Sequence, residues 1–517
     1  MINTTDPVLD EAPGQNKEVP HVLPERIMST HPTHAVTAEV PRLEDKTIQP
    51  IPADERHGKA RDLFTIWFGS NIMIMTIVTG GLATTVFGLS FVPAIVAIII
   101  GNLVGGIFMA LHSAQGPQLG VAQMIQTRGQ FGSYGALLIV VIVVIMYVGF
   151  FAANLVFGGQ ALAAVSPGIS VDTGIIVIGV LSVIATIFGY RLIHAYARVL
   201  SIVAGLALVL AFVWILAVHG LPASFLDQGN FNWVGFMATI SVSALWQLAY
   251  APYVSDYSRY MPQGTGSAPA FWASYSGCVL GTLFPMVLGA LVGTLALALI
   301  NDGSTVEIVG SLGAMLGPWT MVIIGIFCLG VAASNAMNLY CGVLCTLTIG
   351  QTFRPAWLPH AKTRTIAAIL IFTLALLIAL FARDNFIFFY TNFLSFLMYV
   401  LVPWTAINLV DYYLLRHGDY RVEDFFKRDG GVYGRFNWVA IGAYVAGALI
   451  QVPFSATAVF TGPIAAAMNG VDVSWIVGLV VVAPLYYFAA RVFRKKSEAA
   501  PFQSPAFAAE LIEAPRA

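Results

Sequence analysis

Long apolar stretches follow one another along the chain from Leu63 onward, and short polar segments separate them. Each stretch has about 18–30 residues, and a helix of about 20 apolar residues spans the hydrocarbon core of a bilayer. The pattern predicts twelve membrane-spanning helices, at residues 63–86, 91–112, 134–164, 172–190, 196–219, 234–257, 269–300, 318–348, 364–382, 386–414, 437–458 and 473–491. We therefore expect an all-α membrane protein.

The two ends of the chain differ from this apolar middle part. Residues 1–61 are polar and contain eight prolines, and residues 491–517 carry 8 charges. Sequence of this kind cannot bury enough apolar surface to fold on its own. We predict a disordered cytoplasmic amino tail over 1–61, a transmembrane domain over 62–491 and a cytoplasmic carboxyl tail over 492–517.

The composition excludes other classes of protein. Hydrophobic residues make up 58% of the chain and charged residues 10%, whereas roughly 25% of the residues in a soluble domain are charged. The net charge of −1 provides no basic surface for a nucleic acid. The four cysteines lie in apolar stretches without the spacing of metal ligands, which favours a role as small core residues.

Lysine and arginine residues are distributed unevenly between the polar segments. If both termini are cytoplasmic, 24 of the 25 basic residues fall in cytoplasmic segments and only Arg383 lies outside. Positively charged loops resist translocation, so they remain on the cytoplasmic side. A miscounted helix would exchange the sides of every later loop. The distribution therefore supports twelve spans in the plasma (inner) membrane, with both ends in the cytoplasm.

Polar side chains inside the spans are the first candidates for a binding site, because an unsatisfied polar group in hydrocarbon is costly. Most are amides and hydroxyls: Ser70, Asn71, Asn154, Gln247, Ser334, Asn335, Asn338, Asn392 and Asn408. The acidic residues Asp62, Asp256 and Asp411 lie near the cytoplasmic ends of spans. Amides both donate and accept hydrogen bonds. They suit a neutral ligand with alternating N–H and C=O groups, such as a nucleobase.

Three spans contain sequences that predict an interrupted helix. The first holds Gly69-Ser70-Asn71, the sixth holds Trp246-Gln247 followed by Pro252, and the eighth holds Gly330 and Ser334-Asn335. The first and sixth spans are five apart. Interrupted helices at matching places in two halves indicate an inverted-repeat transporter with a site near mid-membrane. The two halves show no convincing residue-level similarity, so the repeat is inferred from position alone.

Aromatic residues cluster near the same interruptions. They are Phe150 and Phe151 in the third span, and Trp246, Tyr250 and Tyr253 in the sixth. A planar heterocycle stacks well between aromatic rings, which adds about 0.5–1.5 kcal/mol to simple burial. Core packing or contact with lipid is the alternative role for each ring.

Six motifs in a fixed order resemble the nucleobase-cation-symport-1 family over about residues 50–495. They are Ile66–Gly69, Ile100–Leu103, Pro252–Tyr260, Asn335–Tyr340, Asp411–Tyr413 and Gly431–Ala440. The motif that closes the sixth span is most similar to the purine-cytosine permease branch. The resemblance implies a leucine-transporter-like core, a 5+5 inverted repeat of ten helices with two more, and secondary active uptake by alternating access.

The resemblance also implies a substrate site. Carried over by motif, its residues are Met73, Phe150, Asn154, Trp246, Gln247, Asn335 and Asn338. Phe150 stands where many members have Trp, and Gln247 stands where many have an aromatic residue. The second difference puts an aromatic sandwich in doubt, and Tyr250 is an alternative source of the second ring.

The sodium site of sodium-coupled members falls on Gly69 and Ile72 in the first span and on Gly330, Ala333 and Ser334 in the eighth. Ala333 lacks a hydroxyl that the family pattern supplies. Because a hard cation binds several oxygen ligands, the loss of one weakens sodium binding. The coupling ion stays open between proton and sodium, and the missing hydroxyl favours the proton.

The sequence thus predicts a symporter that imports cytosine or a purine with a cation. Alternatives are a carrier of allantoin, hydantoin, uracil or another heterocycle, and a passive channel. A membrane-embedded enzyme would need a cluster of His, Asp, Glu or Cys with suitable spacing, and the spans contain none. We expect no cofactor, no nucleic-acid partner and no obligate protein partner; the partners are the nucleobase and the lipid bilayer.

Overall fold

The first span is a bent helix pair. Helix α1 (Ala60–Asn71) and helix α2 (Ile74–Thr85) meet at 61°, and Ile72 and Met73 between them have non-helical backbone angles. The Asn71 side chain donates to the Trp67 carbonyl at 2.6 Å, and the Thr76 hydroxyl donates to the Asn71 carbonyl at 2.6 Å. The Thr76 bond gives the Asn71 carbonyl, at the end of α1, a partner across the break. The predicted interruption is confirmed.

The computed structural model describes residues 48–166, 168–187, 189–299, 306–357 and 359–493. The predicted tails therefore lie mostly outside the described residues. The other long helices are α3 (Phe91–Ser113), α6 (Ala136–Val165), α7 (Val171–Ile187), α8 (Gly189–His219), α9 (Trp233–Leu248), α10 (Ala251–Ser258), α11 (Ser267–Leu299), α13 (Thr320–Phe353), α14 (Ala361–Ala382), α15 (Phe386–Leu409), α16 (Trp438–Gln451) and α18 (Ser474–Phe493). Shorter helices are α4 (Gly116–Leu119), α5 (Gln123–Phe131), α12 (Ile308–Leu316) and α17 (Pro463–Ala467). A π-helical turn, η6 (Val410–Leu415), extends α15.

Helix length and hydropathy agree with a protein that crosses the membrane many times. In the described residues, eight helical stretches are long and apolar enough to span a bilayer, or nine with the bent pair. One of these stretches, Ala361–Leu415, contains both α14 and α15, and α7 and α16 are shorter apolar helices. Each of the twelve expected spans thus corresponds to a helix or to a helix pair.

The other two predicted interruptions have different outcomes. The sixth span is divided at Ala249 and Tyr250 into α9 and α10, as predicted. The predicted break in the eighth span is wrong, because α13 continues through Gly330 and Asn335. The amide of Asn335 bonds to neighbouring side chains and to the Phe151 carbonyl of α6. It therefore does not compete for the backbone of its own helix.

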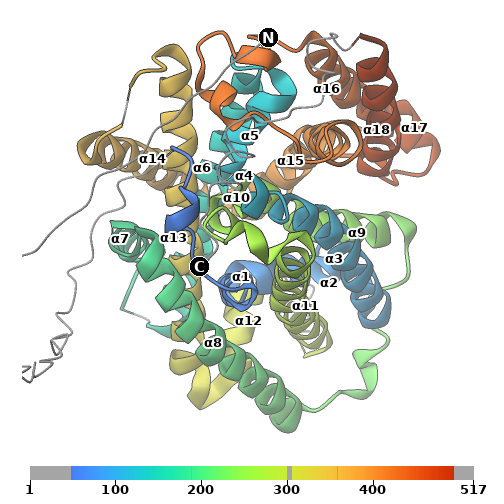
Figure 1. Ribbon diagram of the computed structural model, residues 1–517. Coiled ribbons are helices and arrows are strands. Elements are labelled where there is room, and N and C mark those ends of the chain that lie inside the picture. The colour runs from blue at the N-terminus through green and yellow to red at the C-terminus, as the bar shows by residue number, and fades with distance from the viewer. Residues whose placement is uncertain (1–47, 167, 188, 300–305, 358, 494–517) are drawn as a thin grey trace, which may run out of the picture. The chain divides into compact units, whose positions relative to one another are not determined.

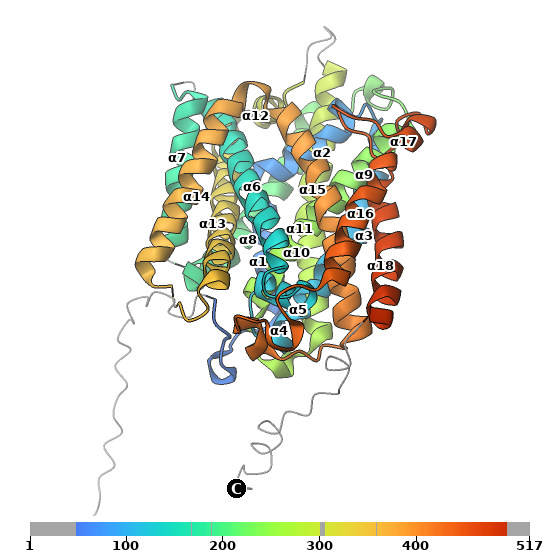
Figure 2. The same cartoon turned by 90° about the horizontal axis from the view of Figure 1, so that it is seen from above.

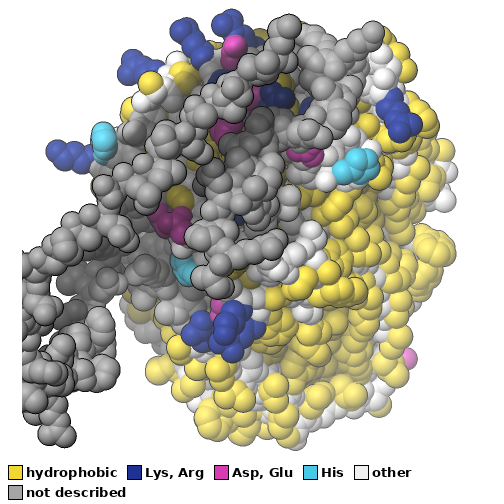
Figure 3. Space-filling model, viewed as in Figure 1, with side chains coloured by type: hydrophobic (Ala, Val, Ile, Leu, Met, Phe, Trp, Pro, Cys, Tyr) yellow, Lys and Arg dark blue, Asp and Glu magenta, His cyan; other side chains and the backbone are white. Residues whose placement is uncertain are grey.

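Helices that are distant in sequence form the core. Helix α3 packs along α9, α11 packs along both α1 and α2, and α6 packs along α13 (Figure 1). The short helices α4 and α5 lie at one end of the long helices, and α12 and α17 lie at the other end (Figure 2). A broad hydrophobic surface covers the region of α3, α8 and α11, with few charged side chains (Figure 3). Such a surface is suited to contact lipid.

Candidate functional site

The broken helices meet around a small central cavity. Its lining comes from α2, α6, α9, α10 and α13: Met75, Phe150, Trp246, Ala249, Tyr250, Tyr253, Ser334 and Asn338. The cavity volume is about 20 Å³, which is room for about one water molecule. The structure is therefore nearly closed at this point, and the helices must separate before a larger ligand can enter.

The wall of the cavity is largely aromatic. Phe150, Trp246 and Tyr250, all predicted to hold the ligand, line it together. The Tyr250 ring meets the Trp67 ring edge to face, with centroids 5.4 Å apart, and Trp246 lies at 6.5 Å from Tyr250. Phe150 packs edge to face on Phe393 at 5.3 Å. These contacts fix the orientation of each ring before a ligand binds, which lowers the entropic cost of binding.

A strip of amides continues from the cavity into the protein. Asn338 is at the cavity wall, where its Oδ1 accepts a hydrogen bond from the Tyr253 hydroxyl. Behind it, the Oδ1 of Asn335 accepts from Asn338 at 3.3 Å and from Asn154 at 3.0 Å. The Asn154 side chain also approaches the Ser334 hydroxyl at 3.4 Å. The buried Asn154 Oδ1 receives no hydrogen bond from the described residues, so one acceptor remains available beside the cavity.

Four of the eight predicted substrate residues are not part of the cavity wall: Met73, Asn154, Gln247 and Asn335. Asn154 and Asn335 lie behind it in the amide strip. Gln247 points toward α3, where its amide donates to the Asn102 Oδ1 at 2.8 Å. Met73 is fully buried at the break, and Met75 lines the cavity in its place. Gln247 is therefore placed to join α9 to α3 rather than to reach a ligand in this conformation.

Sequence reasoning left three lining residues out of the predicted site: Met75, Ala249 and Tyr253. Tyr253 belonged to the aromatic cluster and follows Tyr250 by one helical turn, which was a usable signal. The role of Asn71 was also missed, since its Oδ1 accepts a hydrogen bond from the Trp246 indole at 2.7 Å. That bond ties the two broken helices to each other.

The predicted cation positions gather where α13 meets the first break. A Cβ on Gly330 would lie 2.4 Å from the Ile72 carbonyl oxygen, so the two backbones are in direct contact. Gly69 lies in the last turn of α1, which ends at Asn71. Ala333 can offer only its carbonyl, and the Ser334 hydroxyl already accepts from Asn154. The described residues contain no cluster of three or more His, Cys, Asp or Glu that could hold a metal. A cation at the predicted positions would therefore depend on carbonyl oxygens and on the Ser334 hydroxyl.

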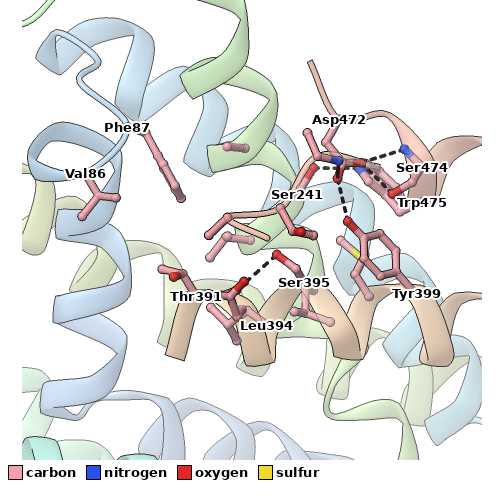
Figure 4. Close-up of a pocket in the computed structure, with 18 residues that line it drawn as sticks. Val86, Phe87, Ser241, Thr391, Leu394, Ser395, Tyr399, Asp472, Ser474 and Trp475 are labelled. Atoms are coloured by element: carbon pink, nitrogen blue, oxygen red, sulfur yellow. Dashed lines mark hydrogen bonds between the residues drawn. The ribbon is translucent and has the colours of Figure 1, made fainter. Parts of the chain in front are cut away.

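A larger cavity of about 270 Å³ lies between α9, α15 and the start of α18 (Figure 4). Its polar groups bond to one another. Asp472 accepts from the Tyr399 hydroxyl at 2.9 Å and from the Ser474 backbone N–H at 2.9 Å, and the Trp475 indole donates to the Ser241 hydroxyl at 3.0 Å. These bonds join α18 to α9 and α15. The central cavity matches the predicted chemistry better, although it is smaller.

A series of buried hydrogen bonds connects two carboxylates at the end of the helices where α4 and α5 lie. It runs through the side chains of Asp411, Tyr420, Gln130, Asn408, Gln115 and Gln123, with donor–acceptor distances of 2.5 to 3.5 Å. The backbone N–H of Gln123 then donates to Asp256 at 2.9 Å. Asp256 lies one turn beyond Tyr253 on α10. The series therefore links the lining of the central cavity to the polar end of the structure.

Arg128 joins α5 to α13 at the same end of the structure. Its guanidinium donates to the Thr348 carbonyl at 3.0 Å and to the Gln351 Oε1 at 2.9 Å, near the end of α13. Burial lowers the pKa of Arg128 to about 10, so the group stays charged at neutral pH. A cation at a helix carboxyl end is favourable because that end carries partial negative charge.

Residues 50–478 match a family of permeases described as acting on cytosine/purines, uracil, thiamine and allantoin. The chain belongs to this permease family. It is 40% identical over 447 residues to the protein named "Putative purine-cytosine permease YxlA" of Bacillus subtilis (strain 168); the match covers 86% of this chain and 95% of that protein. It is 29% identical over 408 residues to the purine-cytosine permease FCY2 of Saccharomyces cerevisiae, covering 74% and 73%.

Solved structures show the same fold. The transporter Mhp1, described as a nucleobase-cation-symport-1 family member in a closed conformation with bromovinylhydantoin bound, superposes with a TM-score of 0.69 at 17% identity, covering 88% of this chain and 98% of that one. Its inward-facing form gives a TM-score of 0.68. The predicted family and the leucine-transporter-like fold are confirmed. The chain is a membrane-embedded transporter and not an enzyme.

The contact between Gly330 and Ile72 predicts a specific sensitivity to substitution. Gly330→Ala should destabilise the protein by about 1–3 kcal/mol, because the added methyl group overlaps the Ile72 carbonyl. Gly325→Ala is the matched control on the same helix, since a Cβ there meets no atom within 4 Å. Thermal unfolding of the two detergent-solubilised variants measures the difference. Equal midpoints for both variants would contradict the close contact.

Proposed function

We propose that this permease imports a neutral nucleobase, cytosine or a purine, by cation symport with alternating access. The observation that carries the proposal is the central cavity, where three predicted aromatic side chains and Asn338 meet at two broken helices. The curated relatives named as purine-cytosine permeases support this class of substrate.

The chemistry of the cavity supports a neutral, planar ligand. Among the described residues, no charged side chain lines it. A substrate with a fixed charge would need a counter-charge or a helix end directed at it. Phe150, Trp246 and Tyr250 offer ring surfaces, and Asn338 offers both a donor and an acceptor to the edge of a base.

The small size of the cavity supports a mechanism of alternating access. At about 20 Å³ it is smaller than any nucleobase, so binding and release require the helices around it to move. The first break contacts α13 at Gly330 and Ile72. Movement of α13 relative to the break would therefore change this contact. The related Mhp1 has been solved in closed and inward-facing forms.

Another heterocycle is the alternative substrate. The family description includes uracil, thiamine and allantoin, and half of this chain is 26% identical to the vitamin B6 transporter TPN1 of Saccharomyces cerevisiae. Allantoin and hydantoin share the N–H and C=O edges of a nucleobase but lack its aromatic ring. Stacking on Trp246 or Tyr250 therefore favours the aromatic bases.

The location we propose is the plasma (inner) membrane, with both termini in the cytoplasm. Its support is the positively charged segments, which include the polar end formed by α4 and α5.

For the coupling ion we propose a proton. The missing hydroxyl at Ala333, which removes one oxygen ligand for sodium, supports it. All three candidate carboxylates have polar partners. Asp62 faces Arg198 at 3.2 Å and Asp411 pairs with Arg416 at 2.9 Å. Asp256 accepts from the Gln123 backbone N–H at 2.9 Å. Asp256 is buried and lies one helical turn from Tyr253 at the cavity. It is the carboxylate best placed to respond to the state of the site.

Uptake in proteoliposomes tests the transport proposal. Purified protein should concentrate radiolabelled cytosine when a proton gradient is imposed, and unlabelled purines should compete. A sodium gradient is imposed separately at constant pH. Uptake that only equilibrates would indicate a channel. Competition by allantoin, hydantoin or uracil, with none by cytosine or purines, would support the alternative substrates.

The position of Asn338 predicts a loss of affinity on substitution. Asn338→Ala should weaken cytosine binding about 5- to 150-fold, because a lost hydrogen bond in a buried site costs about 1–3 kcal/mol. Asn392→Ala is the control, since this amide of α15 bonds to the Phe388 carbonyl and lies outside the central cavity. Equilibrium binding measures both variants. Parent-like protection of Asn338→Ala by cytosine in a thermal-shift assay would exclude Asn338 from the site.

The Ser334 hydroxyl distinguishes the two ions. With proton coupling, cytosine binding should be independent of sodium at constant pH and ionic strength, in the parent and in Ser334→Ala alike. With sodium coupling, Ser334→Ala would remove a ligand from a weak site and raise the sodium concentration needed for half-maximal binding. Sodium-dependent binding by the parent would overturn the proton proposal.

A further inference from the structure

A cavity of about 590 Å³ lies apart from the transport site, at the end of α18 and the start of α16. This end of the helices is the one that carries α4 and α5 (Figure 2). Its lining comes from the end of η6, from the segment before α16 and from the last turns of α18. The cavity therefore opens where a helical pair meets the polar boundary of the membrane.

The floor of this cavity is polar and rigid. Asp411 and Arg416 form an ion pair at 2.9 Å, and their side chains are only 3% and 7% exposed. The Tyr486 hydroxyl donates to Asp411 at 2.9 Å, and the Arg416 guanidinium lies 4.8 Å from the centre of the Tyr433 ring. The two charges balance each other. The floor therefore has no net charge with which to attract a charged ligand, and such a ligand must be recognised by side chains at the rim of the cavity.

The rim combines one available cation with exposed rings. Arg435 is exposed and belongs to the lining of the cavity. Next to it, Phe436 and Trp438 stack at 5.2 Å and remain 47% and 70% exposed. Phe493, on the opposite side of the lining, is 69% exposed. Basic residues and exposed aromatic rings together are typical of the level of lipid headgroups.

One further feature extends this pattern away from the cavity. The packed pair α16 and α18 exposes apolar side chains along its length, such as Leu449 at 65% and Val480 at 66%. A ligand for this place would have an anionic head at the cavity and long apolar chains along the two helices.

We propose that this cavity binds the headgroup of an anionic phospholipid, such as phosphatidylglycerol. Arg435 pairs with the phosphate, Phe436 and Trp438 contact the glycerol region, and the acyl chains lie on α16 and α18. A free phosphate ion would use Arg435 but would gain nothing from the exposed rings. The combination of cation, rings and apolar helix surface therefore favours the lipid.

Thermal stabilisation of the full-length protein in a neutral detergent tests the proposal. Phosphatidylglycerol should raise the unfolding midpoint more than phosphatidylcholine does, and inorganic phosphate should not reproduce the effect. Arg435→Gln should weaken phosphatidylglycerol binding about fivefold, as expected for one basic side chain near the membrane surface. Arg354→Gln, at another exposed arginine, should retain parent-like binding.

A second measurement keeps the proposal independent of the stability of any variant. Native mass spectrometry of the parent protein counts the lipids that survive delipidation, and phosphatidylglycerol should be retained in preference to phosphatidylcholine. Trp438→Ala should reduce that retention. Equal retention of the two lipids, stabilisation by phosphate alone, or an unchanged response in Arg435→Gln would each overturn the proposal.

Discussion

The break between α1 and α2 is the feature on which the transport site depends. A backbone interrupted inside a membrane protein leaves polar groups that water cannot satisfy, so nearby side chains must do so. The Thr76 hydroxyl donates to the Asn71 carbonyl across the break, and the Trp246 indole donates to the Asn71 side chain. The same contacts that stabilise the irregular backbone therefore bring the second broken helix to the cavity.

Close packing at the break also explains the composition of α13. Gly330 allows the Ile72 carbonyl to approach the helix backbone, and the amides that follow on α13 face α6 and the cavity. The amide strip ends at Tyr253, from which α10 continues to Asp256 and the buried series of hydrogen bonds. One short helix thus connects the cavity wall to the polar end.

The lipid cavity shares one residue with that series. Asp411 belongs both to the floor of the cavity and to the series of hydrogen bonds that reaches Asp256. Occupancy by a phospholipid would therefore affect a group that is connected to the transport helices. The two cavities nevertheless have different chemistry, because the central one lacks charged lining residues within the described chain and the outer one contains an ion pair and a rim cation.

The sequence by itself determined the membrane class, the order of the spans and the breaks in the first and sixth spans. It also supplied the polar and aromatic candidates for the site. These features could be predicted because the length of an apolar stretch and the positions of Gly, Pro and amide residues are local properties of the sequence. Only the tertiary structure decided which candidates face the cavity. Gln247 donates to Asn102, which lies 145 residues away in sequence, and Asn335 accepts from Asn154 of α6 within a continuous α13. The direction of a polar side chain depends on the partner that packing brings to its helix, and no local pattern contains that partner.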